Sequence, residues 1–150
     1  MDNLASPVQL FDSASSTYTY ILVDESSREG LIIDPVDEQI ERDLATLEQH
    51  NIKLVWAVET HGHADHITSA GKLAELAGAK TAAPLGCNIG TAGVQLQDGD
   101  TLNFGGETLK VTPINRAHGI LMSGIIGARA TVTGGGNTGG TVGVAPEVKL

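Results

Sequence analysis

Apolar runs and polar turns alternate in the first part of the chain. Residues 17–23 are rich in aromatic and β-branched side chains, and residues 31–33 form a second apolar run that ends at Asp34-Pro35. The residues between the two runs, 24–30, are polar and end in glycine. Short runs of this composition on both sides of a polar turn are typical of paired strands. The pattern therefore predicts a β-hairpin.

Two later stretches carry apolar residues at helical spacing. The apolar positions are Ile40, Leu44 and Leu47 within residues 37–50, and Ala70, Leu73, Ala74 and Ala77 within residues 68–77. Such spacing places these side chains on one face of a helix. Acidic residues occupy the first turn of the first stretch, where the helix dipole favours them, and Gly78 follows the second, where helices commonly end. Both stretches are predicted to be amphipathic helices.

Three further patterns predict strands. Residues 54–58 are apolar without interruption, which indicates a strand covered on both faces. Residues 80–83 form a short strand candidate, and residues 101–104 and 107–111 are predicted to pair as a hairpin around two consecutive glycines. Strands that alternate with helices indicate an α/β layered architecture, in which functional loops commonly lie at strand ends.

The composition narrows the class of protein. A chain of 150 residues is long enough for one domain with a buried core. Its net charge of −9 disfavours nucleic acid and anionic membranes as partners, because both would repel it. The single cysteine, Cys87, has no internal partner for a disulfide, and the start of the chain lacks the basic and apolar regions of a signal peptide. No stretch reaches the length of a membrane span, so we expect a cytoplasmic protein.

The last part of the chain differs from the rest. Of the 18 acidic residues, 17 lie before residue 108, whereas residues 112–150 contain 9 of the 19 glycines and few charges. Glycine raises the entropy cost of ordering a chain, and this segment shows neither helical nor strand periodicity over most of its length. We therefore divide the sequence into residues 1–111 and a divergent glycine-rich tail, residues 112–150.

The clearest chemical signal is the segment 60–66, which follows the predicted strand 54–58. Four of its side chains can bind a metal ion: His61, His63, Asp65 and His66. Imidazole nitrogen suits zinc and iron, and a loop leaving a buried strand can turn all four groups toward one point. The alternative is a solvated loop, or histidines that each make ordinary hydrogen bonds. We favour a metal site, since four ligand-type residues in so short a loop are hard to explain otherwise.

The spacing His61-x-His63-x-Asp65-His66 after an apolar strand resembles the HxHxDH signature of the metallo-β-lactamase superfamily. The resemblance implies an αββα sandwich with a metal centre at one edge, of which this chain is expected to hold the N-terminal half plus an irregular tail. Further segments, from residue 7 to residue 113, resemble the persulfide dioxygenase branch of that superfamily: residues 16–20, 31–36, 59–68 and 98–100. Members of that branch oxidise glutathione persulfide to sulfite with iron (Fe2+) and dioxygen.

The resemblance also implies roles for the loop residues. His61 matches the first ligand of an iron triad of two histidines and one carboxylate, whose open positions leave room for persulfide and dioxygen. His63, Asp65 and His66 match positions that bind metal in the binuclear hydrolases and surround it in the iron enzymes. Asp65 and His66 are expected either to orient the imidazoles of an iron site or to bind a second ion in a zinc site. In a zinc thioesterase, Asp65 would act catalytically by assisting the deprotonation of the attacking water.

The resemblance ends after Thr112-Pro113. The glycine-histidine-threonine turn of the branch does not follow, and no acidic residue lies between Glu107 and Glu147. The second histidine and the carboxylate of the iron triad therefore have no aligned counterpart. His118 is either a substitute ligand or an incidental histidine of the tail. With suitable codons a shift of reading frame within residues 115–119 would restore Thr-Gly-His-Thr, so the tail is interpreted as disordered or out of frame.

Three functions remain open from the sequence. The first is an iron persulfide dioxygenase acting on a small-molecule thiol or persulfide such as glutathione persulfide. The second is a zinc thioesterase of the glyoxalase II type. The third is a non-catalytic metal-binding fragment, because the later ligands are missing. Iron is the expected cofactor and zinc the alternative, and the oligomeric state is not indicated.

Overall fold

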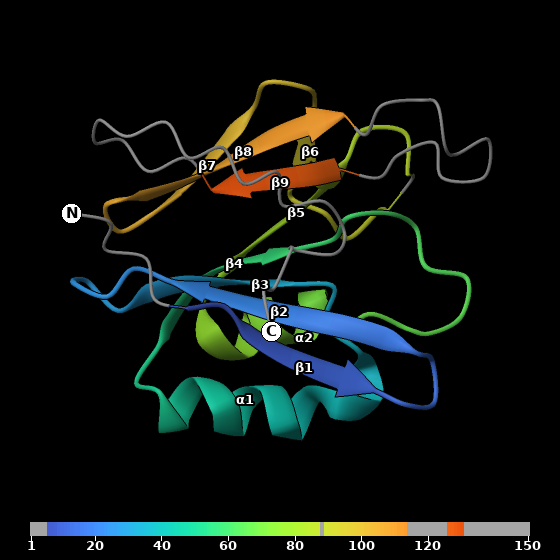
Figure 1. Ribbon diagram of the computed structural model, residues 1–150. Helices are drawn as coiled ribbons and strands as arrows, with labels where there is room; N and C mark the ends of the chain where they lie inside the picture. Colours follow the sequence, from blue (N-terminus) through green and yellow to red (C-terminus); the bar gives the residue numbers. More distant parts are fainter. Residues whose placement is uncertain (1–5, 88, 114–125, 131–150) are drawn as a thin grey trace.

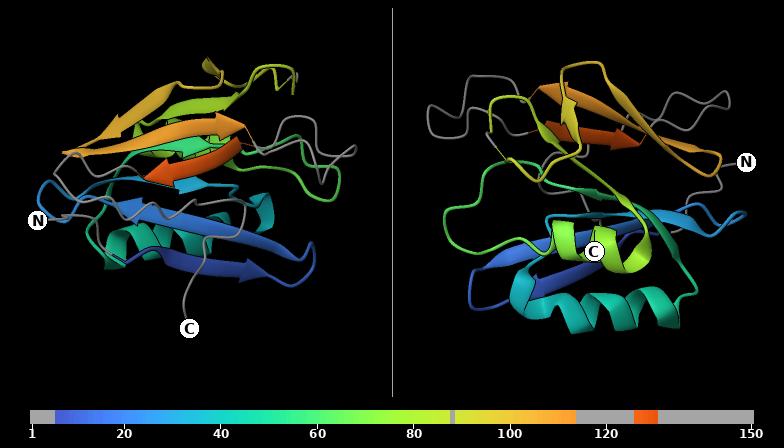
Figure 2. Two further views of the ribbon diagram at one scale, coloured as in Figure 1. Left: turned by 45° about the horizontal axis from the view of Figure 1, so that its top comes forward. Right: turned by 180° about the vertical axis from the view of Figure 1, so that it is seen from behind.

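The computed structural model describes residues 6–87, 89–113 and 126–130, which form two packed β-sheets and a helical layer (Figure 1). The strands are β1 Val8–Asp12, β2 Thr17–Val23, β3 Glu29–Ile33, β4 Lys53–Val58, β5 Lys80–Pro84, β6 Val94–Leu96, β7 Thr101–Phe104, β8 Glu107–Pro113 and β9 Ile126–Ala130, and the helices are η1 Asp37–Gln39, α1 Ile40–Gln49 and α2 Ala70–Ala77. Strands β1 to β6 form one sheet in chain order, and β7 to β9 form the second. The helices lie on the face of the first sheet that is turned away from the second (Figure 2). Within the described ranges, no helix is long and apolar enough to cross a membrane.

The direction of the strands brings several loops to one edge of the first sheet. Strands β1, β2 and β3 pair antiparallel, whereas β3 to β6 pair parallel. The carboxyl ends of β3, β4 and β5 therefore lie at the same edge, together with the amino end of β2, which runs in the opposite direction. Loops at this edge of a parallel sheet are the usual place for a binding site.

Two apolar clusters hold the layers together. The cluster between the sheets consists of Tyr20, Leu22, Leu31, Ile33, Val58, Ala82, Leu96, Leu102, Phe104, Leu109 and Val111. The cluster between the first sheet and the helices consists of Ile21, Val23, Ile32, Leu47, Ile52, Leu54, Ala57, Ala70 and Leu73. Successive residues of a strand point to opposite faces, so β2 and β3 contribute to both clusters. The centre of the first sheet is thus covered on both faces, as the apolar run of residues 54–58 indicated.

The structure confirms the main predicted elements and the α/β sandwich. The two predicted hairpins are β2 with β3 and β7 with β8, and the other predicted strands are β4 and β5. The stretch 37–50 begins as the short helix η1 and continues as α1. Helix α2 ends at Gly78, whose φ of 70° is the left-handed conformation that a terminal glycine adopts readily.

The hydrophobic pattern does not indicate three of the strands, β1, β6 and β9. Strand β6 has only three residues, and β1 is a partly exposed strand at the edge of its sheet, so neither contains a long apolar run. Strand β9 lies within the tail, where no strand was expected, and pairs antiparallel with β8. His118 and most of the remaining tail lie outside the described residues.

Asp24 joins the two sheets at the end of the first sheet that lies opposite the carboxyl ends of β3, β4 and β5. Its carboxylate accepts hydrogen bonds from the hydroxyl and N–H groups of Ser26 and Ser27, and from the N–H of Gly106 in the turn between β7 and β8. The bonds from the Ser27 hydroxyl and the Gly106 N–H hold the pKa of Asp24 well below its ordinary value. Gly105 has a φ of 60°, and a Cβ there would overlap Asp24 and Ser27. Glycine is therefore required where the sheets meet at this edge.

Candidate metal centre

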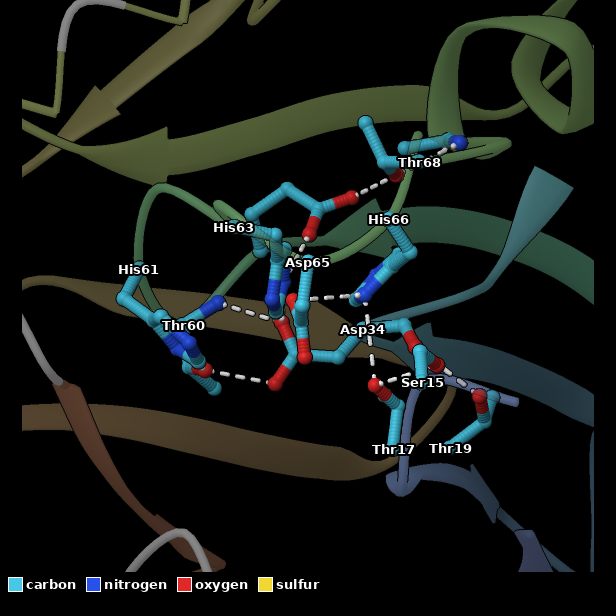
Figure 3. A network of polar contacts seen from close by, with 12 residues as sticks. Ser15, Thr17, Thr19, Asp34, Thr60, His61, His63, Asp65, His66 and Thr68 are labelled. Atoms are coloured by element: carbon cyan, nitrogen blue, oxygen red, sulfur yellow. Dashed lines mark hydrogen bonds and ion pairs between the residues drawn. The ribbon is translucent and has the colours of Figure 1, made fainter. Parts of the chain in front are cut away.

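The histidine-rich loop leaves the carboxyl end of β4 and returns to the sheet immediately before α2 (Figure 3). On its return, Thr68 forms an isolated β-bridge with Val36. The side chains of the loop turn toward Asp34, which follows β3, and toward Thr17, which begins β2. Segments that are far apart in the sequence thus form one polar network at the edge of the first sheet.

Asp34 fixes the start of this loop. Its backbone is left-handed, with a φ of 51°, a conformation that is uncommon outside glycine and is enriched in aspartate and asparagine. Its N–H donates to the carbonyl of Val58 at 2.9 Å, which holds the end of β3 against β4. One carboxylate oxygen accepts the N–H of Thr60 at 2.7 Å, and the other accepts the Thr60 hydroxyl. The first residue of the motif segment is therefore held through both its backbone and its side chain.

Thr60 in turn orients His61. The Thr60 hydroxyl donates its hydrogen to Asp34, so its oxygen is available as an acceptor. The distance between that oxygen and Nδ1 of His61 is 2.8 Å. A neutral imidazole has one N–H and one lone pair. With the N–H on Nδ1 facing Thr60, the lone pair of His61 lies on Nε2 and can bind a metal ion.

His63 is held by two carboxylates. Its Nε2 lies 3.0 Å from Oδ1 of Asp34 and 2.9 Å from Oε2 of Glu59. All three side chains are buried, with exposed fractions of 6% for His63 and Asp34 and 3% for Glu59. Acceptors at Nε2 place the hydrogen there, so the remaining nitrogen, Nδ1, is the one that can bind metal.

His66 provides the third imidazole. Its Nδ1 lies 3.2 Å from the hydroxyl of Thr17 and 3.1 Å from Oδ1 of Asp65. Its Nε2 is buried and has no hydrogen-bond partner among the described residues. A buried polar atom without a partner costs free energy and calls for an explanation. A metal ion bound at Nε2 would supply the missing partner.

The three imidazole rings lie close together. The ring centroids of His61 and His63 are 4.1 Å apart, and those of His63 and His66 are 4.2 Å apart. Two overlapping sets of three residues place their ligand atoms within 4.8 Å of one another: Asp34, His61 and His63, and His63, Asp65 and His66. The four residues expected from the sequence therefore fall into two sets that share His63. Imidazole nitrogen and carboxylate oxygen suit iron and zinc, so the residues fit either ion.

Sequence reasoning gave no role to Asp34 or Glu59. Both lie within segments that resemble the persulfide dioxygenase branch, Asp34 in residues 31–36 and Glu59 in residues 59–68, but nothing in their spacing relates them to His63. A signal was present for Asp34, because an aspartate before proline at the end of a buried strand is well placed to enter a site at the sheet edge.

Burial and charge set different protonation states within the cluster. Burial lowers the pKa of His61, and the neighbouring charge of His63 lowers it further, so His61 is neutral at neutral pH. Burial also opposes a charge on His63, but its hydrogen bonds with Asp34 and Glu59 outweigh burial and raise its pKa to about 10. Burial raises the pKa of Glu59 to about 7. The buried group of His63, Asp34 and Glu59 therefore holds a proton at neutral pH. Metal binding at His63 would displace this proton.

Asp65 and Cys87 lie at the border of the centre. Asp65 is 55% exposed, so its carboxylate is accessible from solvent while it contacts His66. Cys87 is half-buried in the loop after β5, and a Cβ added at Gly62 would lie 3.7 Å from its carbonyl oxygen. The loop that contains Cys87 thus lies against the histidine-rich loop.

Comparisons with known proteins agree with the geometry. Residues 13–86 match the family model of the metallo-beta-lactamase superfamily. The chain is 40% identical over 97 residues to the mitochondrial persulfide dioxygenase ETHE1 of Bos taurus, covering 65% of this chain and 38% of that protein. The crystal structure of ETHE1 from Myxococcus xanthus matches with a TM-score of 0.67 and 40% identity, covering 71% of this chain and 47% of that one. The cytoplasmic hydroxyacylglutathione hydrolase of Arabidopsis thaliana is 36% identical over 59 residues, covering 39% of this chain and 22% of that protein. The chain thus spans less than half the length of each of these proteins.

Proposed function

This chain belongs to the metallo-beta-lactamase superfamily, and from that membership we propose that it is a metal-dependent enzyme most like an iron persulfide dioxygenase. The proposed metal site is supported by an arrangement that all three imidazoles share. In each, an oxygen partner holds one nitrogen, and the other nitrogen is left for a metal ion. The identity of 40% with persulfide dioxygenase ETHE1 favours dioxygenase chemistry over the other activities of the superfamily.

The described residues divide into ligands and supports. We infer that His61, His63 and His66 bind the metal, with Asp65 as a further ligand or as a proton acceptor that solvent can reach. Asp34, Thr60 and Thr17 would keep the rings in place. Iron held by these residues would offer open positions for persulfide and dioxygen and would pass electrons from the persulfide sulfur to dioxygen. His118 lies outside the described residues.

A zinc thioesterase is the second candidate, and a specific observation favours it. His63, Asp65 and His66 form a second set of potential ligands that shares His63 with the first, so Asp65 and His66 are the residues left for a second ion. In such a centre Asp65 would assist the deprotonation of the attacking water. The similarity to hydroxyacylglutathione hydrolase, however, covers only 39% of this chain.

Metal content and oxygen uptake distinguish these functions. The full chain, purified free of metal and shown to be compact by its elution volume, would be loaded with Fe2+ or Zn2+ and assayed with glutathione persulfide and with a glutathione thioester. Oxygen uptake that needs both Fe2+ and the persulfide would support the dioxygenase. Thioester hydrolysis with Zn2+ and no oxygen uptake would support the rival, and bound metal without either activity would indicate a non-catalytic metal-binding fragment.

We also propose a class of substrate and a location in the cell. We infer a small-molecule persulfide such as glutathione persulfide as the substrate, because the relatives are named for persulfide chemistry. The net charge of −9 disfavours nucleic acid and anionic membranes as partners. We infer a cytoplasmic location from the composition, whereas the Bos taurus relative is named as mitochondrial.

A further inference from the structure

Glu59 is a buried carboxylate in the metal centre, outside the histidine-aspartate motif. It follows the last residue of β4, and only 2% of its surface is exposed. One oxygen, Oε2, lies 2.9 Å from Nε2 of His63, and the other accepts the hydroxyl of Thr68. Burying a carboxylate costs free energy unless its oxygens receive hydrogen bonds. The hydrogen bond with His63 therefore stabilises the buried carboxylate of Glu59.

Asp34 approaches the same nitrogen of His63, but its situation differs. Both of its oxygens already accept hydrogen bonds from Thr60, one from the N–H and one from the hydroxyl. Oε2 of Glu59 has no donor other than His63 within the part of the chain that the structure describes. Glu59 therefore depends on a hydrogen at Nε2 of His63, whereas Asp34 is satisfied without it.

The position of that hydrogen decides whether His63 can bind a metal. A neutral imidazole with its hydrogen on Nε2 has its lone pair on Nδ1. A carboxylate at the far nitrogen fixes this form and makes the ring a stronger ligand. We propose that Glu59 is a positioning residue that holds the hydrogen of His63 on Nε2 and so presents Nδ1 to the metal ion. This inference rests on the proposed function, since it takes the loop to be a metal site.

Glu59 also has a structural contact that an experiment must separate from this role. Thr68, which bonds its second oxygen, accepts the N–H of Ala70 at 3.1 Å and so connects Glu59 to the start of α2. Replacing Thr68 by valine removes this connection and keeps the contact between Glu59 and His63. Replacing Glu59 by glutamine keeps the size of the side chain, but its amide can donate to Nε2 and so favour the hydrogen on Nδ1.

The test compares wild type, Glu59→Gln and Thr68→Val as full chains. Affinities for Zn2+ and Co2+ are measured by competition with a chelator, and long-range proton–nitrogen NMR of the metal-free proteins identifies the nitrogen of His63 that keeps its hydrogen in alkaline solution. We expect Glu59→Gln to bind both ions about 10–100-fold more weakly and to move the hydrogen toward Nδ1. Thr68→Val should resemble wild type in both measurements.

Three results would overturn the inference. These are wild-type affinity in Glu59→Gln, an equal loss of affinity in both variants, or a hydrogen on Nδ1 of His63 in the metal-free wild type. The last measurement needs no folded variant and no bound metal. If wild type takes up neither ion, the proposed function fails, while the NMR measurement still decides where the hydrogen of His63 lies.

Discussion

Buried carboxylates occur at both ends of the first sheet, and their surroundings differ. At one end Asp24 receives hydrogen bonds from two hydroxyl groups and three N–H groups, so donors exceed what one carboxylate needs. At the other end, Asp34 and Glu59 both approach the same N–H group of His63, the one at Nε2. In the same cluster Nε2 of His66 has no partner among the described residues.

This difference separates structural from functional polar groups. A carboxylate that receives an excess of hydrogen bonds is stable in its charged form, and the hydrogen bonds of Asp24 join the two sheets. We expect a cluster in which acceptors and lone pairs exceed donors to bind a cation. Metal binding is therefore expected to depend on the residues around His63, and stability on those around Asp24.

The largest expected effect is the loss of metal binding in His61→Ala. This change removes an imidazole whose Nε2 is directed to the site, whereas Thr60 and Asp34 keep their contacts. Iron and zinc in the purified variant should fall to background, as measured by elemental analysis. Equal metal content in wild type and variant would remove His61 from the site.

Asp34→Asn should have a smaller effect on the same measurement. The amide retains one oxygen but cannot accept bonds from Thr60 on both sides and also face His63. We expect metal affinity to fall by about 10–100-fold, the usual range for a residue that orients a ligand. Unchanged metal affinity in a folded variant would mean that Asp34 supports only the backbone of the loop.

Asp24→Asn should affect stability rather than metal binding. The new amide group would face donors from Ser27 and Gly106, so the junction of the sheets should weaken and the thermal midpoint should fall. Because the folded pKa of Asp24 is depressed, wild type has its full contribution above the ordinary aspartate pKa and loses it as the pH falls through the folded value. The variant should lack this acid dependence when unfolding is followed against pH. Metal affinity per folded molecule should stay at the wild-type value, and a large loss would contradict the separation of the two ends.

Cys87→Ala should have the smallest effect. The residue is half-buried, and the contact of its loop with Gly62 involves the carbonyl oxygen rather than the thiol. Metal content should be unchanged, and the free energy of unfolding should change by about 0.5 kcal/mol or less. A loss of metal comparable to that in His61→Ala would show that the thiol belongs to the site.

Much of the fold could be predicted because its signals are local. The apolar spacing at Ile40, Leu44 and Leu47 follows from the geometry of a single helix, and Gly78 ends α2 through its own backbone conformation. Strands such as β6 and β9 give no comparable signal. Strand β6 has only three residues and β9 lies in the glycine-rich tail, so their pairing with β5 and β8 supplies the order that their own residues do not indicate.

The sequence by itself determined that three histidines and an aspartate leave a buried strand in one loop, which predicts metal chemistry. Only the tertiary structure decided which nitrogen of each ring is available. Some of the contacts responsible are local, such as those of His61 with Thr60 and of His63 with Glu59. Others join His63 to Asp34, 29 positions away, and His66 to Thr17, 49 positions away. Hydrogen bonds over such separations depend on parallel strands ending at a common edge, and no spacing within the loop encodes them.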